Sequence, residues 1–129
     1  MEVVPAPASS PGPPQWFTGD VWIDAIATGA APPGLILSAV RFAPGARTAW
    51  HAHESGQTLF VTEGRGRAQS RGSAIVELRP GDIVVTPGGE EHWHGAAPDH
   101  AMSHLSMTSG PASWGDHVSE AEYRPTTAP

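Results

Sequence analysis

The sequence contains no cysteine and no lysine among its 129 residues. Without cysteine there is no disulfide framework, no thiolate nucleophile and no cysteine-ligated zinc or iron–sulfur centre. Without lysine there is no Schiff-base catalysis and no pyridoxal phosphate enzyme of the kind that needs an internal lysine. The chemistry of this chain therefore depends on other side chains.

Basic charge and long apolar runs are also scarce. Seven arginines stand against thirteen acidic residues, which gives a formal net charge of −6, and the arginines form no cluster. This balance argues against a nucleic-acid partner or an anionic membrane surface. The opening stretch MEVVPAPASSPGPP lacks the basic and apolar regions of a secretory signal, and no apolar run approaches the length of a membrane span. We therefore expect a cytoplasmic protein that acts on a small molecule.

Glycine and proline, by contrast, are abundant. Fifteen glycines and 14 prolines separate short apolar runs at fairly regular intervals, a pattern typical of an all-β sandwich or barrel. Residues 1–15 are expected to form a disordered or extended arm, followed by one domain over 16–129. The predicted strands cover residues 16–24, 34–42, 47–53, 57–64, 66–71, 74–79, 82–87, 91–96 and 101–108. A short helix is predicted over 119–124, which Ser119 and Glu122 would open with a capping box.

Two pairs of histidines are the main candidates for chemistry. His51 and His53 lie two residues apart on a predicted strand, so both imidazoles project from the same face. His92 and His94 repeat this arrangement on another strand. Two imidazoles on one strand face can clamp a metal ion, and a barrel would bring the two strands together. The alternative is a polar interior without metal, but converging imidazoles in a dry cavity are costly unless they are hydrogen-bonded or ligated.

The spacing around these histidines follows two motifs. Gly45 begins the pattern G-x5-H-x-H-x3-Q-x6-G, and Gly81 begins G-x5-P-x-G-x2-H. With these motifs the chain resembles the cupin superfamily, in which Glu usually stands at the position of Gln57 and Asn at that of Ala96. The resemblance implies an all-β double-stranded β-helix, or jelly-roll barrel, that holds one divalent metal. The metal ligands that it implies are His51, His53, Gln57 and His92.

The implied ligand set restricts the metal only in part. Three imidazoles and one amide oxygen suit Mn²⁺, Fe²⁺, Ni²⁺ or Zn²⁺, and ligand type alone does not choose among them. Because neutral Gln57 replaces a carboxylate, the site gains one unit of net positive charge, which favours Lewis-acid chemistry over oxygen activation. Glu54 is the rival oxygen ligand, but it points to the opposite strand face from His53.

One subgroup of the family fits more closely. The stretches WFTG, PGARTAWHAH, GQTL, PGDIVV, EEHWHGAAP and AMSHL resemble small bacterial cupins that act as manganese-dependent hydroxynitrile lyases on mandelonitrile. The resemblance runs from about Trp16 to Arg124, and it implies Mn²⁺ and the reversible cleavage of a cyanohydrin to an aldehyde and HCN. The catalytic residues that it implies are His94, His104 and Arg41. The substrate-binding residues that it implies are Ser38, Val40, Thr48, Leu59 and Thr108.

The strand pattern agrees with most of these implied positions. Ser38 and Val40 share one strand face, whereas Arg41 falls on the opposite face. Either His94 or His104 is expected to take the hydroxyl proton of the substrate. A fold and a metal site alone do not determine function, so two alternatives stay open. One is a cupin oxygenase or isomerase acting on a small carbonyl or enol compound, and the other is a non-catalytic module that binds a small molecule.

Aromatic residues near the start of the domain suggest an assembly. Trp16, Phe17 and Trp22 lie in a segment that a second copy of the chain could cover, which predicts a homodimer or homotetramer. The alternative is that these side chains pack on their own barrel.

Overall fold

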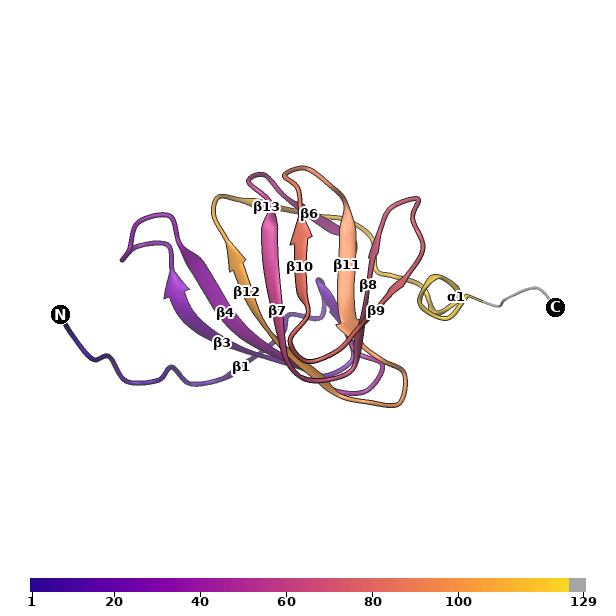
Figure 1. Ribbon diagram of the computed structural model, residues 1–129, viewed down its shortest axis with the longest axis horizontal. Helices are drawn as coiled ribbons and strands as arrows, with labels where there is room; N and C mark the ends of the chain where they lie inside the picture. Colours follow the sequence, from indigo (N-terminus) through magenta and orange to yellow (C-terminus); the bar gives the residue numbers. More distant parts are fainter. Residues whose placement is uncertain (126–129) are drawn as a thin grey trace.

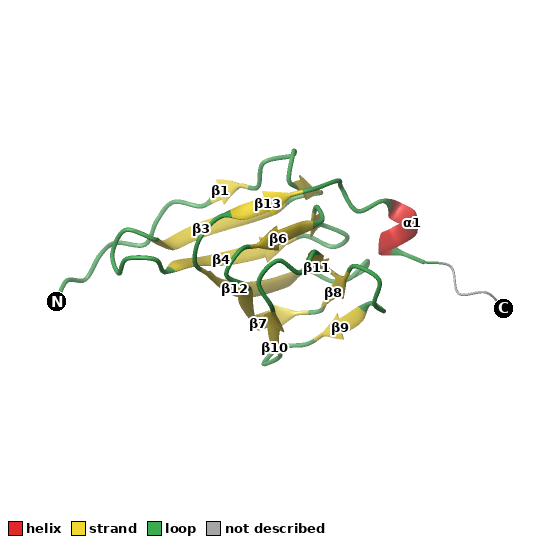
Figure 2. Ribbon diagram, turned by 90° about the horizontal axis from the view of Figure 1, so that it is seen from above, coloured by secondary structure: helices red, strands yellow, loops and turns green. Residues whose placement is uncertain are grey.

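The computed structural model of the chain describes residues 1–125 and shows two curled β-sheets that enclose a common interior (Figures 1 and 2). All strand pairs are antiparallel. The first sheet has the order β1-β3-β4-β12-β7-β10. Its strands are β1 (Ser10–Pro11), β3 (Val21–Thr28), β4 (Ile36–Phe42), β7 (Gln57–Gly64), β10 (Ile83–Thr86) and β12 (Met102–Thr108).

The second sheet carries most of the histidines. Its main path has the order β13-β6-β11-β5-β2, and β8 joins it by pairing with both β11 and β9. Its strands are β2 (Phe17–Thr18), β5 (Arg47–Thr48), β6 (His51–His53), β8 (Gly66–Ser70), β9 (Val76–Leu78), β11 (His92–Ala96) and β13 (Ala112–Trp114). The all-β jelly-roll prediction is confirmed, because two antiparallel sheets of this kind form that barrel.

The predicted strands differ from the observed ones where the backbone bends. The strand expected over 16–24 breaks at Gly19, whose φ of 81° lies in the left-handed region that glycine tolerates. The strand expected over 47–53 divides into β5 and β6, because the backbone amides of Ala49 and Trp50 donate to carbonyls outside β11. The short strands β1 and β13 were not predicted, and β1 begins the packed part of the chain earlier than expected.

The interior of the barrel is divided between apolar and polar halves. Inward positions near one end of the strands form the larger core cluster, which includes Val21, Val40, Phe42, Val61 and Met102. The histidines follow further along the same inner faces. Burial of these apolar side chains supplies the main favourable term for folding. The polar half of the interior therefore lies against a packed apolar core.

Two of the three aromatics considered for an assembly pack on their own barrel. Trp16 stacks on Trp114 with ring centroids 5.0 Å apart, and Phe17 lies 6.0 Å from the same ring. Trp22 remains on the outer face of the first sheet. The exposed apolar side chains of this face include Trp22, Phe60, Ile83 and Val85. The homodimer or homotetramer stays a prediction.

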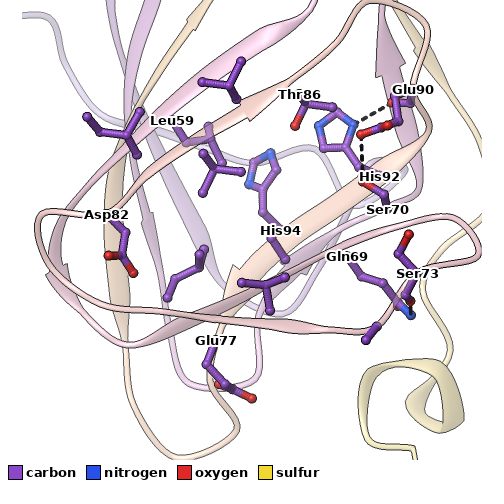
Figure 3. Close-up of a pocket in the computed structure, with 17 residues that line it drawn as sticks. Leu59, Gln69, Ser70, Ser73, Glu77, Asp82, Thr86, Glu90, His92 and His94 are labelled. Carbon is purple, nitrogen blue, oxygen red and sulfur yellow. Dashed lines mark hydrogen bonds between the residues drawn. The ribbon is translucent and has the colours of Figure 1, made fainter.

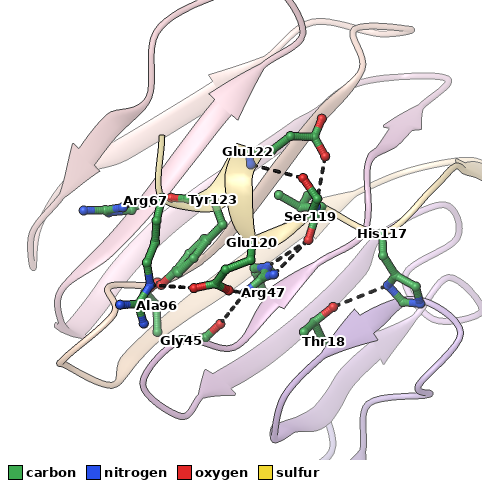
Figure 4. A network of polar contacts seen from close by, with 12 residues as sticks. Thr18, Gly45, Arg47, Arg67, Ala96, His117, Ser119, Glu120, Glu122 and Tyr123 are labelled. Carbon is green, nitrogen blue, oxygen red and sulfur yellow. Dashed lines mark hydrogen bonds and ion pairs between the residues drawn. The ribbon is translucent and has the colours of Figure 1, made fainter. Parts of the chain in front are cut away.

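The C-terminal segment is fastened to the outside of the second sheet. The predicted capping box is present: Ser119 caps α1 (Glu120–Tyr123), and Glu122 completes the reciprocal pair. Tyr123 is fully buried, and its hydroxyl donates to the carbonyl of Ala96 on β11 (Figure 4). The guanidinium of Arg47 lies 4.3 Å from the centroid of the tyrosine ring. No helix in the described part of the chain has the length and apolar composition needed to cross a membrane.

This fastening predicts a loss of stability when the tyrosine hydroxyl is removed. Tyr123→Phe leaves the buried carbonyl of Ala96 without its donor, which should lower the free energy of unfolding by about 1–2 kcal/mol. Guanidinium denaturation followed by tryptophan fluorescence measures the change. Ser103→Ala is the control, because it alters a strand residue whose side chain makes no described hydrogen bond. A Tyr123→Phe midpoint equal to that of the wild-type chain would show that the hydroxyl contributes nothing.

Candidate functional site

Three histidines of the second sheet converge as the motifs predicted. His51 on β6 pairs across the sheet with His92 on β11, and His53 lies two residues along β6 on the same face. One ring nitrogen from each of the three imidazoles lies within 4.8 Å of the others. Strand alternation and the β6–β11 pairing therefore create a three-nitrogen cluster inside the barrel.

Backbone carbonyls fix the tautomers of two of these imidazoles. Nδ1 of His51 lies 2.9 Å from the carbonyl oxygen of Ala49, and Nδ1 of His92 lies 2.9 Å from that of Glu90. Because a carbonyl only accepts, each Nδ1 carries the proton and donates it. The Nε2 lone pair of each ring is then left to face the interior, which is the arrangement that second-sphere contacts give to metal-binding histidines.

Burial keeps the cluster neutral. Burial and the neighbouring His92 lower the pKa of His51 to about 3 and that of His53 to about 4. Burial also lowers the pKa of His92. A metal ion binds neutral imidazole, so these histidines are in the ligating form near pH 7 without having to release a proton.

Gln57 adds an oxygen to the cluster from the opposite sheet. Its Nε2 donates to the hydroxyl of Ser106 on β12 at 2.9 Å, which turns its Oε1 toward Nε2 of His92, also at 2.9 Å. The amide oxygen has no proton, and neutral His92 has its proton on Nδ1. Two acceptors therefore face each other at close range, which is unfavourable unless a cation lies beside both.

These side chains fit a divalent cation. Besides the opposed lone pairs of Gln57 and His92, Nε2 of His53 is buried and has no hydrogen-bond partner within the described part of the chain. Three neutral nitrogens and one neutral oxygen form a borderline donor set that suits first-row divalent metals. The residues that would hold the cation are His51, His53, Gln57 and His92.

A second histidine pair lies next to the cluster. Nε2 of His104 on β12 and Nδ1 of His94 on β11 are 3.0 Å apart, so one of the two rings donates to the other. The rings of His51 and His94 have centroids 5.2 Å apart. Burial lowers the pKa of His104 to about 4, and burial together with the neighbouring His104 lowers that of His94 well below its ordinary value. Both imidazoles are therefore neutral near pH 7, and one N–H of the pair is donated in the hydrogen bond between them.

Arg41 does not lie in the pocket, which corrects the placement implied by the resemblance. Its side chain is 48% exposed on the outer face of β4, where it pairs with Asp24 at 3.0 Å and donates to the hydroxyl of Ser9. The physical reason is strand alternation: because Val40 points into the core, Arg41 must point away from it.

The five implied lining residues occupy different parts of the interior. Thr48 accepts a hydrogen bond from the backbone amide of His94, and Val40 is buried beside His104. Leu59 lies in a cavity that reaches His92 and His94 (Figure 3). Ser38 pairs with Ser106 across β4 and β12, and Thr108 lines a second cavity together with Gln57.

The sequence analysis did not identify two residues that contact the site, Ser106 and Trp114. Trp114 on β13 stacks on His51 with centroids 4.6 Å apart and an interplanar angle of 25°. Because Trp114 pairs with His51 across β13 and β6, the two side chains lie on the same face of the sheet, and the stacked indole restricts the orientation of the imidazole. A three-residue strand is too short to show a period-2 pattern, so no sequence signal pointed to it.

The geometry of Gln57 predicts a role for Ser106 in metal affinity. Ser106→Ala removes the acceptor that orients the amide, so the amide is free to turn its nitrogen toward the cluster. We expect the dissociation constant for Mn²⁺, measured by calorimetry on the chelator-treated chain, to rise about 10-fold or more. Gln57→Glu has two equivalent oxygens, so Ser106→Ala should cost much less in that background. Equal losses in both backgrounds would contradict the orienting role.

Comparison with known proteins shows the family to which the chain is similar. The family model described as Cupin domain matches residues 38–108, which span both histidine pairs and His104. A curated protein of Granulicella tundricola named (R)-mandelonitrile lyase is 49% identical over 130 residues, which cover 96% of this chain and 99% of that protein.

Solved structures agree on the fold. A cupin-like protein from Thermotoga maritima has a TM-score of 0.87 and 40% identity, with 96% of each chain covered. A predicted oxalate decarboxylase from the same organism has a TM-score of 0.71 at 18% identity, with 80% of this chain and 92% of that chain covered, and so bears on the fold alone. From the family match, the near full-length similarity and the histidine cluster, it follows that the chain belongs to the cupin family.

Proposed function

We propose that this chain is a metal-dependent hydroxynitrile lyase that reversibly cleaves cyanohydrins such as mandelonitrile to an aldehyde and HCN. The observation that carries the proposal is the neutral His94–His104 pair beside a neutral metal donor set. The similarity to the (R)-mandelonitrile lyase of Granulicella tundricola supports the same reaction. Carbon–carbon cleavage of this kind needs a polarised oxygen and a nearby base, and it needs no oxidant.

The donor set accounts for the first requirement. A divalent cation held there, which we propose to be Mn²⁺, supplies Lewis-acid polarisation of the substrate oxygen. All four residues that would hold it are uncharged, so the ligands do not neutralise its charge. His51 and His92 are fixed by the carbonyls of Ala49 and Glu90, which limits how far the donor set can relax between substrate binding and release.

The histidine pair accounts for the second requirement. As the bond between the hydroxyl-bearing carbon and the nitrile carbon breaks, its electron pair leaves with cyanide and the hydroxyl proton must be removed. We assign that proton to the His94–His104 pair. Nε2 of His94 and Nδ1 of His104 are both buried, and neither has a hydrogen-bond partner among the described residues. The same pair returns the proton to cyanide to give HCN, so the protein ends the cycle unchanged. In synthesis the steps run in reverse.

Neighbouring side chains hold both imidazoles of the pair in place. Phe42 contacts both rings, with centroids 6.0 Å from His94 and 5.3 Å from His104. Thr48 holds the backbone of His94 from the adjacent strand. Because Phe42, Thr48 and the hydrogen bond between the two rings hold both imidazoles in place, neither has to be reoriented during the reaction.

Single substitutions in the pair test the proposal. With Mn²⁺ supplied, the wild-type chain should cleave mandelonitrile, and His104→Ala and His94→Ala should each lower kcat by about 10²- to 10⁴-fold while metal content stays unchanged. His100→Ala is the matched control, because that half-exposed imidazole pairs with Asp99 on the surface. Benzaldehyde release is followed by absorbance.

Three results would decide between the functions. Full cleavage by both variants with metal bound would refute the acid–base role. Failure of the metal-loaded wild-type chain to cleave mandelonitrile would refute the proposed lyase function. Oxygen consumption by that chain with Fe²⁺ would then favour an oxygenase.

A further inference from the structure

A cleft opens where the two sheets are not joined. β10 is the last strand of the first sheet. Within residues 1–125, β9 of the second sheet pairs only with β8, and no strand pairing connects β9 with β10. The seam between them contains a cavity of about 460 Å³, within the range of small-molecule sites. Figure 3 shows this cavity with residues from both sheets around it.

The inner end of the cleft is polar and reaches the proposed reaction centre. His92 and His94 line it from β11, and Thr86 lines it from β10 (Figure 3). Nε2 of His94 is buried and has no hydrogen-bond partner among the described residues. A buried nitrogen of this kind is stabilised by a ligand that offers it a polar group.

The walls next to this polar end are apolar and leave space. Ala68 on β8 pairs with His94 across the strands, so its methyl group lies on the same sheet face as the imidazole. Leu59 and Val84, which pair with each other across β7 and β10, line the opposite wall. A small residue beside His94 provides room for the body of a ligand whose polar group reaches the histidines.

The charge of the cleft restricts the ligand further. Among the lining residues that the structure describes, three are carboxylates and none is an arginine. The Glu77 carboxylate is paired with Arg67 at 3.2 Å, and that of Glu90 accepts from the hydroxyl of Ser70. Asp82 accepts a hydrogen bond from the backbone amide of Arg79. The excess of carboxylates disfavours a ligand that carries its own carboxylate near the mouth.

We infer that this cleft binds the apolar body of the substrate, admits neutral aromatic or branched aliphatic aldehydes and cyanohydrins, and rejects those that carry a carboxylate. The polar carbon of the substrate then lies at the inner end, beside His92 and His94, and its substituent points outward between β8 and β10. The identity of that polar carbon rests on the proposed function. The shape and charge of the cleft do not.

Binding of two matched aldehydes tests the inference without relying on turnover. 4-Carbamoylbenzaldehyde and 4-carboxybenzaldehyde have nearly the same shape, and only the second is an anion near pH 7. Binding is measured by ligand-observed NMR on the chain loaded with Zn²⁺ in place of Mn²⁺. We expect 4-carbamoylbenzaldehyde to bind and 4-carboxybenzaldehyde to bind about tenfold more weakly. The double variant Asp82→Asn/Glu90→Gln should reduce this discrimination, because it removes two acidic charges and keeps two hydrogen-bond acceptors.

Steric variants locate the bound aldehyde. Ala68→Leu fills the space beside His94 and should weaken binding of the amide about tenfold or more, while metal content stays at the wild-type level. Ala74→Trp narrows the cleft from an exposed loop position and should have the same direction of effect without disturbing the core. Ala121→Leu on α1 is the control and should leave binding unchanged.

The outcomes separate the two proposals. Aldehyde binding that Ala68→Leu and Ala74→Trp weaken, in a chain that does not cleave mandelonitrile, would support the cleft and overturn the lyase function. Mandelonitrile cleavage with wild-type kcat/KM in both variants would support the lyase function and overturn the cleft. Equal affinity for the amide and the carboxylate would overturn the charge selectivity.

Discussion

The contact between the Gln57 amide oxygen and the His92 imidazole governs the rest of the site. Each atom is held there by a neighbour: the Ser106 hydroxyl accepts a hydrogen bond from the amide of Gln57, and the Glu90 carbonyl accepts one from Nδ1 of His92. Two lone pairs are thereby brought to 2.9 Å inside a barrel that offers neither a proton. A cation bound there would resolve this conflict, and because all four proposed ligands are neutral they would not offset its charge. The Lewis-acid role that we propose depends on that charge.

One strand, β11, connects the histidine cluster, the histidine pair and the C-terminal helix. β11 carries His92 into the donor set and His94 into the histidine pair and the cleft, while its Ala96 carbonyl holds Tyr123 on the outside. Its five residues are all buried, which is unusual for a strand so rich in polar groups and is possible because each side chain has a defined partner or faces the cavity. The C-terminal helix is thus hydrogen-bonded, through Tyr123, to the strand that carries both His92 and His94.

Much of this could be predicted from the sequence because strands alternate with a fixed period. The H-x-H pairs and their motif spacing placed His51, His53 and His92 together, and the capping box at Ser119 was correct. Strand alternation also indicated that Arg41 lies on the opposite strand face from Val40, as observed, whereas the resemblance implied that Arg41 lies in the pocket. Features set by how strands meet in three dimensions could not be predicted. Trp114 comes from a strand too short to show a pattern, and the cleft exists because β9 and β10 do not pair.

Metal content and activity measured on the same sample test the central claim most directly. The purified chain is analysed by plasma mass spectrometry and assayed for mandelonitrile cleavage before chelation, after chelation and after reloading with Mn²⁺. We expect close to one ion per chain, cleavage that falls as the ion is removed and returns with reloading, and loss of both metal and cleavage in His92→Ala. Cleavage that persists after the metal has been removed, or a chain that binds no divalent ion, would contradict it.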